Sequence, residues 1–179
     1  MHTIIYLLFL LISTTPTFAQ PNPEALKTEM QKLDFLVGKW EGTGWIQYGP
    51  NRSVFSGTET VQRKLDGLIL MVEGLHKTQI PNRPEPIVVH HALGIFSYNP
   101  AGQHFRFRTY LHKGQEGDYT AHWENDALIW EMDIPNMGQM RYTIRLNKAG
   151  QWYEIGERST DGKTWTQFFE MTLNRIGDA

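Results

Sequence analysis

The spacing of hydrophobic residues changes once along the chain, at about residue 38. Before this point Leu26, Met30, Leu33 and Val37 recur at helical intervals, which places them in one stripe along a helix. After it, apolar and polar residues alternate, and turn sequences recur roughly every 8–14 residues, as in antiparallel barrels and sandwiches. The pattern predicts a short helix over 23–37 followed by strands over 38–175.

The predicted helix has signals at both ends. Asn22 can accept a hydrogen bond from a free N–H group, Pro23 suits the first helical position, and Glu24 complements the helix dipole. Gly38 stands where a C-terminal cap is expected. This helix has one apolar face, which must pack against a larger body.

Ten strands are predicted, and most of them are joined by hairpins. The strongest hairpin signal is Asp66-Gly67, a pair that tolerates positive φ at both central positions of a two-residue loop. The one long irregular connection is 78–86, which holds three prolines. The predicted strands are 38–48, 53–65, 68–77, 87–98, 103–112, 117–124, 127–133, 138–147, 151–159 and 164–175.

A meander of ten strands would leave two open sheet edges, which invite aggregation. Closing the sheet on itself removes both edges. We therefore predict an all-β fold, an antiparallel up-and-down β-barrel of about ten strands, with the short N-terminal helix plugging or flanking one end.

The first 19 residues are expected to lie outside the fold. Residues 4–12 form an apolar run too short to span a bilayer, which takes roughly 20 residues, and small and polar residues follow up to Ala19. We expect a signal peptide over 1–19, cleaved after Ala19, and one domain over 20–179, periplasmic or secreted from a bacterium. A retained membrane anchor is the alternative, and no later segment is apolar enough to cross a membrane.

Composition limits the function. The 179 residues carry 17 basic and 19 acidic side chains, a balance that gives no field able to attract nucleic acid or anionic lipid. The absence of cysteine excludes disulfides, thiolate metal sites, iron–sulfur clusters and a cysteine nucleophile. The sequence contains no typical histidine metal motif and no hydrolase or nucleotide motif. We expect no metal, no cofactor and no nucleic-acid partner, and the oligomeric state is left open.

The segment GKWEGTG at 38–44 carries both a structural and a family signal. Trp40, Gly42 and Gly44 share one face of the first strand, where the glycines let the strand coil and Trp40 can close one end of the barrel. The segment resembles the G-x-W opening of the lipocalin-like, or calycin, barrels, and more specifically the G-x-W-x-G-x-G opening of nitrobindin-type haem-binding barrels.

Over roughly residues 33–176 the chain resembles the DUF1579 type, a family of bacterial secreted proteins. The matching stretches are FLVGKWEG at 35–42, TETV at 58–61 with LDG at 65–67, ALGIFSY at 92–98, and WYEI at 152–155 leading to STDGKTW at 159–165. The resemblance implies a lipocalin-like barrel and no established activity.

The resemblance to nitrobindin does not extend to its haem ligand. In those barrels the iron ligand is a histidine near the C-terminal strand, whereas 168–175 contains no histidine and neither does any position after His122. Met171 could ligate iron through its thioether. Its alternation with Phe169 and Leu173 is more typical of a core residue.

His90 and His91 are candidates for a polar group in the interior. Because they are adjacent in a strand, they point to opposite faces. If Phe96 pairs with Phe105, then His90 faces Leu111 and points inward, and a slip of one residue puts His91 inward instead. Both registers stay open, and so does a hydrogen-bonded core histidine without a further role.

The Asp66-Gly67 turn places Glu59, Arg63 and His76 on one face of a hairpin. If this face is the interior, the three side chains are polar groups in an apolar lining, as in small-ligand sites. If it is the outer face, Glu59 and Arg63 are solvated charges of little consequence. Both alternatives stay open. The apolar residues on this face are Val61, Leu65, Leu68, Leu70 and Val72.

The strand 103–112 alternates apolar residues with His104, Arg106 and Arg108, which is typical of a half-buried strand. The alternative is a basic inner wall for a carboxylate or phosphate. The apolar residues are Phe105, Phe107, Thr109 and Leu111.

We favour a secreted lipocalin-like barrel that binds a small apolar or amphipathic molecule. The first alternative is a cofactor-independent enzyme, which requires His76, His90 or His91 within hydrogen-bond reach of an inward Glu or Arg. A haem-binding barrel and a domain serving only protein association are the remaining alternatives. The candidate ligand-binding residues are Trp40, Glu59, Arg63, His76, His90, His91 and Phe107.

Overall fold

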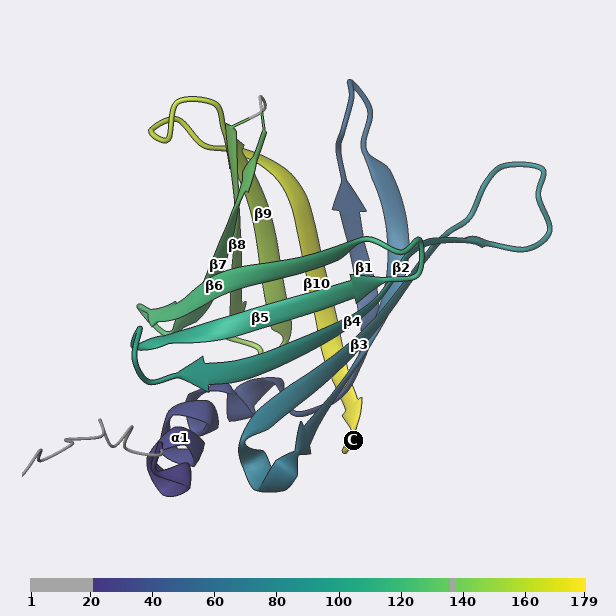
Figure 1. The fold of residues 1–179 in the computed structure, drawn as a ribbon. Coiled ribbons are helices and arrows are strands. Elements are labelled where there is room, and N and C mark those ends of the chain that lie inside the picture. The colour runs from purple at the N-terminus through teal and green to yellow at the C-terminus, as the bar shows by residue number, and fades with distance from the viewer. Residues whose placement is uncertain (1–20, 136–137) are drawn as a thin grey trace, which may run out of the picture.

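The computed structural model describes residues 21–135 and 138–179, which form a ten-stranded antiparallel barrel with a helical segment at one end (Figure 1). The barrel is closed, in the order β1-β10-β9-β8-β7-β6-β5-β4-β3-β2. The predicted fold class is therefore confirmed. The strands are β1 (Gly38–Ile46), β2 (Ser53–Lys64), β3 (Ile69–Thr78), β4 (Ile87–Asn99), β5 (His104–Leu111), β6 (Glu116–Glu124), β7 (Ala127–Ile134), β8 (Gly138–Leu146), β9 (Trp152–Ser159) and β10 (Thr166–Gly177).

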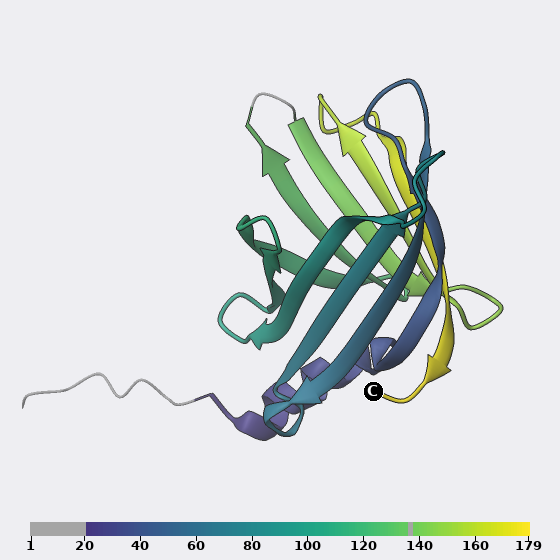
Figure 2. The same ribbon diagram turned by 90° about the vertical axis from the view of Figure 1, so that its right-hand side faces the viewer.

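The helical segment begins as predicted but consists of two parts. The Asn22 side chain accepts a hydrogen bond from the Glu24 amide, and α1 (Pro23–Met30) is followed by a 3₁₀ helix, η1 (Gln31–Leu36). Side chains three apart in a 3₁₀ helix point the same way. This tighter winding aligns Leu33 with Leu36, and both are fully buried. Figure 2 shows the segment lying across one end of the barrel. No helix among residues 21–135 and 138–179 is long and apolar enough to span a bilayer, and the predicted signal peptide lies outside these residues.

Trp40 closes the helical end of the barrel. It is completely buried, and its indole Nε1 donates a 2.8 Å hydrogen bond to the Leu36 carbonyl. The ring meets Trp152 edge-to-face at 5.8 Å, and the Arg175 guanidinium lies 4.1 Å from its centre. Arg175 also donates to the carbonyls of Phe35 and Val37, so one cluster fastens the helical segment to the barrel.

The β2–β3 hairpin has the predicted register but a longer loop. Lys64 pairs with Ile69 and Val61 with Val72, as a turn centred on Asp66-Gly67 requires. The loop is a short 3₁₀ turn in which Leu65 also has positive φ, and the Leu65 side chain is exposed. The expectation that Leu65 shares the apolar face was wrong for this reason.

The register of the β4–β5 hairpin differs by two residues from the one considered above. Phe96 pairs with Phe107, because the loop between Asn99 and His104 has four residues. The Asn99 side chain stabilises this loop by accepting hydrogen bonds from the Ala101 and Gly102 amides. A shift of two preserves the faces, so His90 is the inward histidine of the pair.

The barrel wall parts between β6 and β7. These two strands pair over only four residues, 121–124 with 127–130, whereas all other neighbours pair over six or more. In Figure 1 the strands β5 and β6 turn away from β7 and β8 beyond this point. The helical segment covers one end of the barrel, and toward the other end the inward rings of Tyr119, Trp130 and Tyr142 remain partly exposed.

We predict that Trp40→Ala lowers the free energy of unfolding by about 3–5 kcal/mol, because it empties a large buried volume and removes a buried hydrogen bond. Urea unfolding followed by circular dichroism measures this loss. The control is Trp45→Ala, which removes a half-buried tryptophan from the outer side of the same strand, where it stacks with Arg52. Equal losses in the two variants would contradict the assigned role of Trp40.

Candidate functional site: buried acids and histidines beneath an aromatic belt

Three buried polar side chains from separate strands lie inside the barrel. They are Glu59 on β2, His76 on β3 and Glu154 on β9. Glu59 Oε1 is 2.9 Å from His76 Nε2, and Glu154 Oε2 accepts a 3.1 Å hydrogen bond from the Trp152 indole. His90 continues the group toward the open end, with its ring 4.9 Å from that of His76. We call these residues, Glu59, His76, His90 and Glu154, the acid–histidine cluster.

Glycines on neighbouring strands make room for this cluster. Gly74 pairs with Glu59, and a Cβ atom at Gly74 would lie 2.7 Å from both carboxyl oxygens. Gly57 pairs with His76, and a Cβ atom there would lie 3.0 Å from the imidazole ring. A Cβ atom at Gly74 would displace the Glu59 carboxyl group, and one at Gly57 would shift the His76 ring by a few tenths of an ångström. Glycines in these strands thus leave space inside the barrel for polar side chains.

Aromatic rings form a nearly continuous circuit around the interior, which we call the aromatic belt. Each ring contacts the next one across neighbouring or near-neighbouring strands, and the circuit starts and ends on β4. The contacts, by ring-centre distance, are Phe96–Phe107 (4.0 Å), Phe107–Trp130 (5.1 Å), Trp130–Tyr142 (4.3 Å), Tyr142–Phe169 (5.8 Å), Phe169–Phe55 (5.7 Å), Phe55–His76 (4.6 Å) and His76–His90 (4.9 Å).

Burial makes the charged forms of the cluster unfavourable. It raises the pKa of Glu59 to about 8 and that of Glu154 to about 8, and repulsion from Glu59 adds to the rise at Glu154. Burial also lowers the pKa of His76 and of His90 to about 4. At neutral pH the cluster therefore holds protonated acids and neutral imidazoles. Its carboxyl groups can donate as well as accept hydrogen bonds.

The structure brings five of the seven candidate residues into the interior. Trp40 forms the closed end, Glu59 and His76 are in direct contact, His90 lies beyond them, and Phe107 belongs to the belt. The face of the β2–β3 hairpin that carries Glu59 and His76 is therefore the inner face of the barrel.

Two candidate residues lie outside the interior. Arg63 is at the end of β2, where it forms a 2.6 Å ion pair with Asp34 of η1, so it binds the helical segment to the barrel. His91 is exposed, because the register points its neighbour His90 inward. Neither side chain can contact a molecule held by the acid–histidine cluster.

Glu154 is the main residue that the sequence analysis missed. It stands between Trp152 and Gly156, both of which are buried, whereas Glu157 points outward and pairs with Arg141 at 2.8 Å. An acid that alternates with two apolar neighbours in a strand is the signal that could have identified it. Trp130 and Tyr142 were missed in the same way, since each looks like an ordinary core residue.

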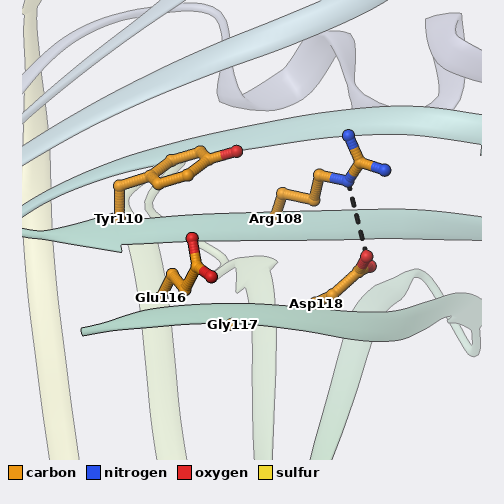
Figure 3. A pocket seen from close by; sticks show the side chains of 5 residues that line it. All are labelled: Arg108, Tyr110, Glu116, Gly117 and Asp118. Carbon is orange, nitrogen blue, oxygen red and sulfur yellow. Dashed lines mark ion pairs between the residues drawn. The ribbon is translucent and has the colours of Figure 1, made fainter. Parts of the chain in front are cut away.

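Two hollows lie away from the interior. Figure 3 shows the first, on the outer wall of β5 and β6, where Arg108 Nε is 3.4 Å from Asp118. Arg106 also binds Asp118, so the two arginines face outward and share one carboxylate there, and the alternative of a basic inner wall was wrong. The second hollow lies between α1 and strands β4–β6. Within 21–135 and 138–179, no three His, Cys, Asp or Glu side chains are grouped to hold a metal ion.

Comparison with solved structures supports the barrel fold but does not bear on function. The barrel is similar to Rv2717c from M. tuberculosis, with a TM-score of 0.56 and 12% sequence identity, over 82% of this chain and 96% of that chain. No family model matches the chain, and no curated protein matches it significantly.

The acid–histidine cluster predicts an unusual dependence of stability on pH. An unfolded Glu loses its proton near pH 4.5, but the folded protein keeps it on Glu59 and Glu154 up to about pH 8. The two acids therefore make the folded protein less stable as the pH rises. Between about pH 4.5 and 6.5 the two histidines have the opposite effect on stability, because their pKa values are lowered in the folded protein. From pH 6.5 to 8 only the acids act, and the free energy of unfolding should fall by about 1.4 kcal/mol per pH unit for each acid.

Urea unfolding at pH 6.5 and pH 8 measures this fall. The double variant Glu59→Gln with Glu154→Gln should abolish it, because the amide mimics the protonated acid and does not titrate. Glu157→Gln is the control and should keep the fall of the wild type. A double variant that loses as much stability as the wild type between these pH values would show that other groups cause the fall and would contradict the raised pKa of the two acids.

Proposed function

We propose that this barrel binds a small amphipathic molecule, with its polar group at the acid–histidine cluster and its apolar body against the aromatic belt. A lining of apolar and aromatic side chains around a few converging polar groups is the usual makeup of a small-ligand site. The fold is compatible with this function, since closed barrels of this size can hold one small ligand.

The observation that carries the proposal is the exposure of the inner wall. Phe107, Tyr119, Trp130 and Tyr142 face the interior but remain only half-buried, whereas the residues of the closed end are fully buried. Large aromatic side chains left in contact with solvent lose the free energy that their burial would supply, about 25 cal/mol for each Å². An apolar molecule entering from the open end would recover it.

We also infer that the chain belongs to the DUF1579 type and is exported. Two of the resembling stretches carry structural roles that a family pattern would preserve. FLVGKWEG at 35–42 supplies the Trp40 closure, and WYEI at 152–155 supplies both Trp152, which contacts Trp40, and Glu154. The support for export is the apolar run at 4–12, which small and polar residues follow up to Ala19.

An acid–base enzyme is the second candidate, and one observation favours it. Glu59 and His76 lie within hydrogen-bond distance, which is the geometry that general acid–base chemistry requires. If the barrel transforms its ligand, incubation should change the ligand's mass, and His76→Gln should retain binding while abolishing turnover. Unchanged ligand after prolonged incubation with the wild type would exclude this candidate.

Native mass spectrometry of the protein purified from its own host tests the proposed function. A bound molecule of a few hundred daltons that remains with the folded protein and is released on unfolding is the expected result. A protein that carries no ligand and binds no apolar probe would contradict the proposal.

Trp130→Ala should weaken the binding of N-phenyl-1-naphthylamine, an uncharged fluorescent probe, by about tenfold or more, since about 1.4 kcal/mol of lost contact corresponds to tenfold in affinity. The change removes the ring at the centre of the belt. The control is Trp165→Ala, because Trp165 lies under Arg141 on the outer wall. Probe fluorescence measures the affinity of each variant. Equal affinities of the Trp130→Ala and Trp165→Ala variants would show that the probe binds outside the interior.

A further inference from the structure

Acids and bases are distributed unequally between the interior and the surface. None of the 17 lysine and arginine side chains is buried. The least exposed two, Lys27 and Arg141, are paired with Glu24 and Glu157 outside the barrel interior. Two carboxyl groups, by contrast, are deeply buried at the base of the open part of the barrel. The interior therefore offers negative charge on deprotonation and no fixed positive charge.

The aromatic belt adds to this polarity. The face of an aromatic ring carries partial negative charge and attracts cations, and Trp and Tyr do so best. Trp130, Tyr142 and Tyr119 lie together on the side of the interior opposite Glu59, with Tyr119 and Trp130 only 5.2 Å apart between ring centres. An organic cation in the interior could therefore contact aromatic ring faces and carboxyl groups at the same time.

We propose that the ligand of this barrel is a protonated amine with an aromatic or aliphatic body, whose ammonium group is held by Glu59 and Glu154. This inference rests on the proposed function and specifies its ligand class. The ammonium group donates hydrogen bonds to the carboxyl oxygens, and the body packs against Trp130 and Tyr142. A carboxylate or phosphate ligand would meet two acids and no buried cation.

Binding is accompanied by loss of one proton from the protein. The amine enters as the ammonium ion, one carboxyl group of the acid–histidine cluster gives its proton to water, and the resulting carboxylate pairs with the ammonium. No covalent bond to the ligand forms or breaks. Affinity should therefore rise about tenfold per pH unit while the acids are protonated in the free protein.

The groups that face the two acids do not supply a competing charge near neutral pH. They are His76 on β3 and His90 on β4, both neutral there, and Tyr142 on β8, whose pKa burial raises further above its ordinary value. On the neighbouring strands Glu59 pairs with Trp40 of β1 and Glu154 pairs with Met171 of β10, and neither partner titrates. Arg175 is exposed on the far side of Trp40, and Arg158 is exposed at the open end.

Three indoles of matched shape test the ligand class on the full-length exported protein. They are tryptamine, which is a cation, 3-ethylindole, which is neutral, and indole-3-propionate, which is an anion. Displacement of N-phenyl-1-naphthylamine measures all three affinities at pH 5.5, 6.5 and 7.5. We expect tryptamine to bind at least about tenfold more tightly than the other two at pH 7.5 and to gain about tenfold per pH unit, while the affinity of 3-ethylindole stays constant.

Calorimetry in two buffers of different ionisation enthalpy counts the protons released on tryptamine binding, and about one is expected. If 3-ethylindole or indole-3-propionate binds as tightly as tryptamine, or if no proton is released, the amine assignment is overturned while the proposed function stands. If neither the probe nor any indole binds, the proposed function itself fails, and the amine assignment fails with it.

Charge-neutral variants separate the role of the two acids from general packing. In the variant carrying Glu59→Gln and Glu154→Gln, the ratio of tryptamine to 3-ethylindole affinity should fall to about one, and its dependence on pH should disappear. Glu157→Gln, on the outer wall, should leave the ratio at the wild-type value. A double variant that binds 3-ethylindole but still prefers tryptamine would contradict the proposal.

Discussion

Two carboxyl groups, Glu59 and Glu154, are buried in the barrel with no buried lysine or arginine to neutralise them, and the character of the interior follows from this constraint. An uncompensated buried carboxylate is far more costly than a protonated acid, so both groups keep their protons near neutral pH. The same burial keeps His76 neutral. The acid–histidine cluster is thus polar but uncharged near neutral pH, and a cation that reaches it can change its protonation.

The surrounding fold maintains this environment. Trp40 and the helical segment cover one end, and the aromatic belt surrounds the acids with rings that carry no charge near neutral pH. Gly74 gives the Glu59 carboxyl its space, which no other residue could do without a clash. Toward the opposite end the pairing of β6 with β7 stops, and the rings of Tyr119, Trp130 and Tyr142 keep part of their surface in contact with solvent. Closure at one end and access at the other are the two features that a binding barrel requires.

The fold was largely predictable from the sequence because its signals are local. Alternation and turns located all ten strands to within about two residues, and Asp66-Gly67 fixed one register, since turn chemistry depends on neighbouring residues. The site was only partly predictable because it depends on contacts between distant strands. Glu59 and His76 were found through their shared hairpin. Alternation could have shown that Glu154 faces inward, but its position beside Glu59 depends on barrel closure, which no local pattern encodes. The β4–β5 register was missed because loop length, and not residue type, decided it.

The central claim is that Glu59 and Glu154 are protonated in the folded protein at neutral pH, and infrared spectroscopy tests it most directly. A protonated carboxyl group has a carbonyl stretching band well separated from the bands of carboxylates and amides. The account predicts such a band at pH 7, lost in the variant with glutamine at both positions and diminished on addition of tryptamine. A spectrum at pH 7 that contains only carboxylate bands would contradict it.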